Sequence, residues 1–156
     1  MDVLDLDSPS GFDIITLWDS FEHLPNIEAY VQHFHRMLNA NGLLIFSTPN
    51  TLSLEWLTAG KRHPQILPPG HVNLFSSRNI GNFLQRNGFL VSEIHTPNAS
   101  LDCSYLESNL NDPHILNGCG AFVATILTDP TLAQSFKNYL VDHQLAGNMV
   151  VIARKQ

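Results

Sequence analysis

The chain has 156 residues, of which 44% are hydrophobic and 14% are charged, so it can bury the core of a single globular domain spanning residues 1–156. A formal net charge of −6 with few basic pairs excludes a broad phosphate-binding face, and we expect no nucleic-acid partner. The chain has two cysteines, and its N-terminus lacks the basic segment and apolar segment of a signal peptide. It also has no apolar run long enough to span a membrane. We therefore expect a cytoplasmic protein without a membrane partner.

The first predicted element is a strand over residues 12–18. Its apolar residues Ile14, Ile15, Leu17 and Trp18 fall on both faces, which is typical of a buried parallel strand. The polar residues 19–23 follow directly. An α/β protein builds its ligand site at such a carboxyl end of a strand, so we expect a ligand site here.

A helix is predicted next, with Asn26 as its N-cap and apolar residues at helical spacing through Leu38. Asn41 and Gly42 are expected to end it in a left-handed turn. The apolar run 43–47 then predicts a second buried strand. Strand, helix and strand with short connections form a βαβ unit, so we expect the two strands to be parallel.

Residues 51–74 contain several prolines and are predicted to form a long loop with a short helix around residues 54–57, serving as a binding element or lid. Ser76 and Ser77 are predicted to cap a helix that ends at Asn87-Gly88, before a third strand over residues 89–94.

The rest of the chain is less regular. Residues 96–119 carry no pattern that assigns an element. Residues 122–144 are predicted to be helical, with Pro130 at a helix start or a break, and their apolar face is expected to cover the sheet. Residues 149–153 form a last apolar strand.

Four segments in order resemble class I S-adenosylmethionine-dependent methyltransferases, in the branch with an FDxI…EHL block and a later STPN strand. They are residues 12–25, the helix that follows, residues 41–50, and residues 70–76 with the helix ending at Asn87-Gly88-Phe89. The resemblance runs from about Asp2 to Ile94 and is looser over the last strand. It implies a partial Rossmann-like α/β sheet holding strands four to seven, mostly parallel with one antiparallel C-terminal strand.

The resemblance also implies site residues and a cofactor, S-adenosylmethionine. Trp18, Asp19 and Ser20 would line the cofactor pocket, and Asp2 would stand where the family's acidic residue faces adenine. Glu22 would lie on the substrate side. His71 suits a loop that closes over the substrate, and it equally suits a loop histidine exposed to water. His23 would be the catalytic base that removes a proton from the acceptor, although it also suits a purely structural polar position in a strand-to-helix loop.

The chain departs from the family pattern at one point. The glycine-rich turn after strand one and the acidic residue ending strand two have no counterpart in it. We therefore expect an incomplete domain that lacks the N-terminal glycine-rich half. Its strand 12–18 would become an unprotected apolar edge, so we expect a homodimer, a separate N-terminal half polypeptide as partner, or poor solubility.

The eight histidines do not predict a metal site. His33 and His35 lie two apart on a predicted helix and point to different faces, and the others lack the tight spacing of a structural zinc site. The expected function is methyl transfer to an unidentified small molecule, once an N-terminal half completes the domain. The alternative is a non-catalytic methyltransferase remnant or interaction module, and a histidine-based metal hydrolase is the weaker third hypothesis.

Overall fold

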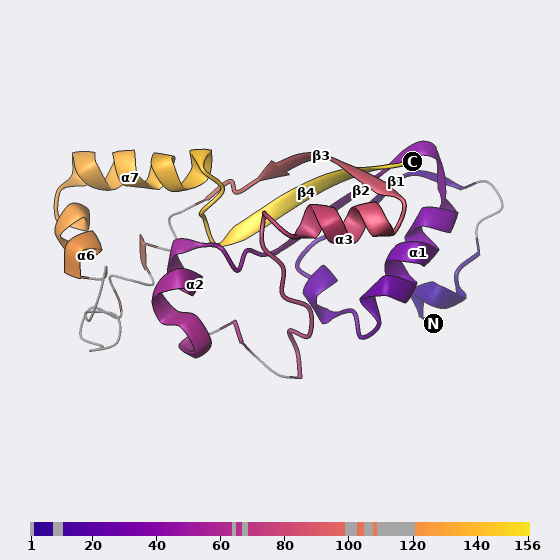
Figure 1. Cartoon of the computed structure of the whole chain (residues 1–156), viewed down its shortest axis with the longest axis horizontal. Helices are drawn as coiled ribbons and strands as arrows, with labels where there is room; N and C mark the ends of the chain where they lie inside the picture. Colours follow the sequence, from indigo (N-terminus) through magenta and orange to yellow (C-terminus); the bar gives the residue numbers. More distant parts are fainter. Residues whose placement is uncertain are drawn as a thin grey trace.

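In the computed structural model the described residues are 2–7, 11–63, 65–66, 69–98, 103–104, 108 and 121–156. The elements run in the order η1 (Val3–Asp5), β1 (Phe12–Leu17), η2 (Phe21–His23), α1 (Ile27–Met37), β2 (Leu38–Pro49), α2 (Leu54–Ala59), η3 (Gly60–Arg62), α3 (Ile80–Arg86), β3 (Phe89–His95), α6 (Ala121–Leu127), α7 (Pro130–Asp142) and β4 (Asn148–Lys155), where η marks a 3₁₀ turn (Figure 1). Within these residues no helix is long and apolar enough to cross a membrane.

The sheet has four strands in the order β1-β2-β4-β3. β1 and β2 are parallel, and β4 runs antiparallel to both of its neighbours, β2 and β3. The predicted βαβ unit and the mostly parallel α/β sheet with one antiparallel C-terminal strand are therefore confirmed. β1 is an edge strand, as expected for a sheet that begins with this strand.

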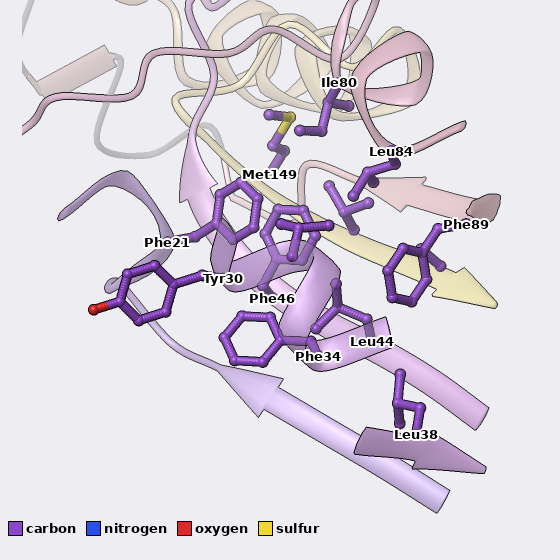
Figure 2. Packing of buried hydrophobic residues seen from close by; sticks show 13 residues of the cluster. Phe21, Tyr30, Phe34, Leu38, Leu44, Phe46, Ile80, Leu84, Phe89 and Met149 are labelled. Carbon is purple, nitrogen blue, oxygen red and sulfur yellow. The ribbon is translucent and has the colours of Figure 1, made fainter. Parts of the chain in front are cut away.

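One face of the sheet is covered and holds the main core. Helices α1 and α3 both pack there, because α1 contributes Tyr30, Val31 and Phe34, and α3 contributes Ile80 and Leu84, to one buried cluster with strand residues (Figure 2). The strand residues of this cluster are Leu38, Leu44, Phe46, Phe89, Met149, Val151 and Ala153. All of them are buried, and this face supplies most of the apolar burial of the described chain.

The other face of the sheet carries apolar side chains as well, but they lie outside every buried cluster of the described residues. On this face Ile45 pairs with Ile152 of β4, and Ile14 pairs with Leu43. Ile14 is 53% exposed. We call this surface the uncovered face.

The junction between α1 and β2 differs from the prediction. The helix ends at Met37, and Leu38 pairs at once with Phe12 of β1. The next four residues form a bulge before the pairing resumes at Leu43, and Asn41 has its left-handed backbone (φ 62°) inside that bulge. Leu38 is buried in the main core, so β2 begins there, five residues before the predicted strand start at residue 43.

Two further predictions were wrong in detail. Asn79, and not Ser76 or Ser77, is the N-cap of α3, because residues 76–79 first form a turn in which Asn79 Oδ1 accepts from the Ser76 amide at 2.8 Å. The apolar face of residues 122–144 does not cover the sheet. Helices α6 and α7 lie beyond its end (Figure 1), and they pack on each other and on Leu54 of α2. Phe122 is 69% exposed as a result.

The predicted break at Pro130 is confirmed. Pro130 begins α7, and Asp129 caps that helix by accepting from two backbone amides. The segment that carried no predicted element lies largely outside the described residues.

A single buried amide fastens the loops at the end of β2. Asn50 Nδ2 donates to the carbonyls of Gln144 and Ala146 at 2.9 and 3.0 Å, and Asn50 Oδ1 accepts from the Ser77 amide at 3.1 Å. The same oxygen accepts from the amide of Leu52. Three connections that are distant in sequence therefore meet at one side chain.

Candidate functional site

The candidate site lies where β1 and β2 end. Both strands run in the same direction, so their carboxyl ends meet at one edge of the sheet (Figure 1). Trp18 follows β1 directly, and its side chain is 58% exposed. A large aromatic side chain that stays exposed at a strand's end is a candidate ligand surface rather than part of the core.

Asp19 is held in one conformation by β2. Its backbone is left-handed (φ 47°), and its amide donates to Ser47 Oγ at 2.8 Å, while Ser47 Oγ donates back to Asp19 Oδ1 at 2.8 Å. Asn148 Nδ2, at the start of β4, also donates to Oδ1 at 3.4 Å. Asp19 therefore ties three strand ends together, and its carboxylate fixes the turn that presents Trp18.

After Ser20, which is half-buried, the chain turns inward at η2. Phe21 is fully buried and stacks on Phe46 with ring centroids 3.9 Å apart. This stack anchors η2 to the core, so the two residues that follow Phe21 have fixed positions at the rim of the sheet.

The segment from Gly70 to Phe75 is strapped onto η2. The backbone carbonyl of Glu22 accepts from the amides of Val72 and Asn73 at 3.0 and 3.1 Å. Asn73 Nδ2 donates to the carbonyl of Leu24 at 2.7 Å. We call residues 70–75 the strap, and it explains how a long loop returns to the end of β1.

The strap brings His71 to His23. The two rings meet edge to face with centroids 4.7 Å apart. His23 Nδ1 donates to the carbonyl of Gly70 at 2.9 Å, because a carbonyl can only accept. Nε2 of His23 is thereby left with a lone pair, and it lies 4.0 Å from Glu22 Oε1.

Asp2 lies apart from this group, and its carboxylate is already engaged. It accepts from the Tyr30 hydroxyl at 2.8 and 2.9 Å and from the Leu4 amide at 3.0 Å, as the N-cap of η1. The backbone hydrogen bond from Leu4 and then the Tyr30 hydroxyl hold the pKa of Asp2 below its usual range. The same hydroxyl bond to Asp2 raises the pKa of Tyr30.

The structure adds site residues that the sequence did not indicate. A hollow of about 230 Å³ lies at the start of β4, and its described lining is Glu55, Gln65, Pro97, Asn98, Gly147 and Asn148. Asn148 connects this hollow to the Asp19 turn. These residues come from four separate segments, so no local motif could have predicted their proximity.

The other histidines of the described residues lie outside the His23–His71 group. His63 stacks on Trp56 with centroids 4.2 Å apart, and its Nε2 lies 3.3 Å from Glu55 Oε1. His95 pairs with Glu93 at 2.6 Å on the exposed side of β3. His33 is buried in α1 and contacts Arg36 through Nδ1 at 3.3 Å.

Comparison with solved structures supports the fold. The chain superposes on a S-adenosylmethionine-dependent methyltransferase from Mesorhizobium loti with a TM-score of 0.55 and 16% identity, covering 99% of this chain and 67% of that one. It matches the [4+2]-cyclase SpnF with a TM-score of 0.53 and 16% identity, covering 99% and 54%. It matches magnesium protoporphyrin IX methyltransferase from Synechocystis PCC 6803, solved with bound SAH, with a TM-score of 0.51 and 13% identity, covering 100% and 49%.

These likenesses show the Rossmann-like fold of S-adenosylmethionine-dependent methyltransferases. The chain spans between about half and two thirds of the length of these three structures. No curated protein matches the sequence. A family described as "Methyltransferase domain" matches residues 3–94, which is more than half of the chain. The chain therefore belongs to this methyltransferase domain family.

Proposed function

We propose that this chain forms the C-terminal half of a S-adenosylmethionine-dependent methyltransferase, with its site at the ends of β1 and β2. The observation that carries the proposal is the polar cluster at the carboxyl end of an exposed parallel edge strand in the order β1-β2-β4-β3. In such sheets ligands bind beyond the carboxyl ends of the strands. The acceptor we propose is a small molecule, in keeping with the similarity to the methyltransferase of magnesium protoporphyrin IX.

The residues at the end of β1 fit part of this cofactor. S-adenosylmethionine, when bound, supplies an electrophilic methyl group on a positively charged sulfur. The exposed face of an indole attracts a cation, and Trp18 offers such a face. Ser20 would lie beside it, and Asp19 would act by holding the turn, because its carboxylate already accepts from Ser47 and Asn148.

Asp2 has the weakest support among the proposed cofactor residues. Its carboxylate oxygens accept from Tyr30 and Leu4, so an adenine amino group would have to share them. The described residues also provide no glycine-rich turn in front of a helix, so the main grip on the cofactor would come from the partner half described below.

His23 is the proposed catalytic base. The Gly70 carbonyl binds Nδ1–H and leaves the Nε2 lone pair to take the proton that an acceptor hydroxyl or amine loses as it is methylated. Glu22 and His71 would line the acceptor side, because both lie next to this nitrogen. The strap would exclude water from the acceptor.

The proposed partner is an N-terminal half polypeptide or a second copy of this chain, in the cytoplasm. Its place would be the Phe12–Trp18 edge and the uncovered face. β1 has no proline or lysine to blunt its edge. A hollow of about 250 Å³ beside it is lined by Val3, Leu6, Phe12, Ile14, Ile15, Thr16, Leu17, Phe34 and Met37. A Rossmann-like half-sheet would offer a parallel strand and apolar helices to both surfaces.

Calorimetry with S-adenosylmethionine and S-adenosylhomocysteine tests the proposal. The chain alone should bind weakly, and a complex with a polypeptide carrying the glycine-rich half should bind more tightly. Trp18→Ala should weaken binding to the complex, whereas Phe122→Ala is the matched control, because Phe122 is also an exposed aromatic residue but lies on α6. No heat of binding in either sample would contradict the cofactor proposal.

The alternative is a non-catalytic remnant or interaction module. The absence of a glycine-rich turn in front of a helix among the described residues favours this alternative. Under this alternative the complex would form through the β1 edge but bind neither compound.

A further inference from the structure

Three potential metal ligands meet at the rim of the site. Glu22, His23 and His71 each offer one ligand atom, and these atoms all lie within 4.8 Å of one another. Two of the residues belong to η2, and the third comes from the strap. Because 48 residues separate His23 from His71, the sequence spacing gave no reason to expect this group.

The Glu22 carboxylate needs a positive partner. Glu22 is only 3% exposed, and its Oε2 is buried without a hydrogen-bond partner. The nearest group that could carry positive charge within the described residues is His23, whose Nε2 lies 4.0 Å from Glu22 Oε1 but holds no proton in this tautomer. A buried carboxylate without donors or a cation is costly, so this geometry favours a ligand that brings positive charge.

Each histidine offers a ring nitrogen within 4.8 Å of the other and of the Glu22 carboxylate. The Gly70 carbonyl fixes the tautomer of His23 and leaves Nε2 as an acceptor. A carbonyl that binds the second nitrogen is the usual way in which proteins orient a metal-binding histidine. Nδ1 of His71 is buried and has no hydrogen-bond partner.

We propose that Glu22, His23 and His71 bind a divalent first-row transition-metal ion such as Zn²⁺. Two imidazoles and one carboxylate form a donor set that suits such an ion, whereas Mg²⁺ and Ca²⁺ prefer oxygen ligands alone. Tetrahedral ligands about 2.1 Å from the ion lie roughly 3.4 Å apart. The side chains would therefore move inward by up to roughly 1.4 Å from their present separation.

Three protein ligands would leave one position of a tetrahedral ion open. An oxygen or nitrogen of an acceptor could bind there and be made more acidic by the ion. His23 would then serve as a ligand instead of a base, because one lone pair cannot hold both the ion and a proton. The metal proposal rests on the geometry of these three side chains. Metal binding can be measured without S-adenosylmethionine, so its test is independent of the cofactor proposal.

Titration of the metal-free chain with Co²⁺ tests the proposal, because cobalt replaces zinc and absorbs visible light according to its ligands. We expect one saturable absorption band per chain, abolished by an excess of Zn²⁺. Glu22→Gln, His23→Ala and His71→Ala should each weaken binding by at least about tenfold. Glu22→Gln nearly keeps the shape of the side chain, so it separates loss of charge from loss of fold.

His95→Ala is the matched control, because His95 also pairs with a glutamate but lies on exposed β3. It should leave the cobalt band unchanged. Circular dichroism of each metal-free variant checks that the fold is retained. The proposal is overturned if the folded wild-type chain gives no saturable band, or if folded Glu22→Gln and His71→Ala bind as tightly as the wild type.

Discussion

The two faces of the sheet differ in whether helices of the described chain cover them. The face under α1 and α3 is closed by buried side chains from two helices and all the strands except β1, whose Ile15 and Leu17 pack against it partly buried. The uncovered face also carries apolar residues of β1 and β2, namely Ile14, Leu43 and Ile45. None of them joins a buried cluster of the described chain. An apolar pattern alone therefore does not distinguish strand residues of the core from strand residues outside every buried cluster. Neighbouring residues of one strand can test this difference.

The largest effect is expected from the covered face. Phe46→Ala removes a fully buried ring that stacks on Phe21, so it should lower the free energy of unfolding by about 3–5 kcal/mol. Ile45→Ala, next to it on β2 but on the uncovered face, should cost clearly less. Urea unfolding followed by circular dichroism measures both. Equal losses would mean that the uncovered face is buried in solution.

The next effect concerns the pair of hydrogen bonds between Ser47 and Asp19 at the candidate site. Ser47→Ala removes a buried hydroxyl that both accepts from and donates to Asp19, and leaves the Asp19 amide unpaired. We expect a loss of about 1–3 kcal/mol in the same unfolding measurement. Ser77→Ala is the control, since its hydroxyl makes only a 3.4 Å contact with the Gln144 carbonyl. A similar loss in the control would show that the Ser47–Asp19 hydrogen bonds contribute no more to stability than an ordinary surface hydroxyl.

A smaller effect on stability is expected at the β1 edge. Ile14→Lys places a charge on a half-exposed position, so the free energy of unfolding should change by no more than about 0.5 kcal/mol. Association should nevertheless be lost, because an edge lysine opposes strand pairing. Sedimentation velocity of the two proteins tests this. A wild-type chain that stays monomeric at all concentrations would contradict self-association through this edge.

The smallest effect concerns the Asp2–Tyr30 pair. The lowered pKa of Asp2 means that its contribution to stability is present at neutral pH and is lost as pH falls below about 4. The raised pKa of Tyr30 means that its contribution is present below about pH 10 and is lost as pH rises through the raised value. Tyr30→Phe should remove the loss of thermal stability at alkaline pH and only reduce the loss at acid pH, because the Leu4 amide still binds Asp2, and an unchanged profile would contradict this.

The sequence predicted the parts of the fold that depend on local pattern. Strands β1 to β4, the βαβ unit and the break at Pro130 followed from apolar periodicity and capping residues. The end of α1 did not, because Leu38 leaves the helix to enter the core, which is a tertiary effect. The orientation of α6 and α7 was also missed, since an apolar helix face does not specify which surface it packs against.

The candidate site also has a part that the sequence predicts and a part that it does not. Residues 18–23 are contiguous, so their place at the end of β1 could be expected from the sequence. The contacts of Ser47 and Asn148 with Asp19, and of the strap with η2, join residues 28 to 129 positions apart. Only the strand order and the loop path bring such residues together.

The Asn50 amide has a consequence for how this fold can change. The connections it holds include the start of the α2 loop, the approach to α3 and the turn between α7 and β4. Each loop is fastened at its root, so insertions or deletions beyond that point need not disturb the strands. A new binding specificity could therefore arise by exchanging loops on an unaltered sheet, provided that position 50 keeps an amide.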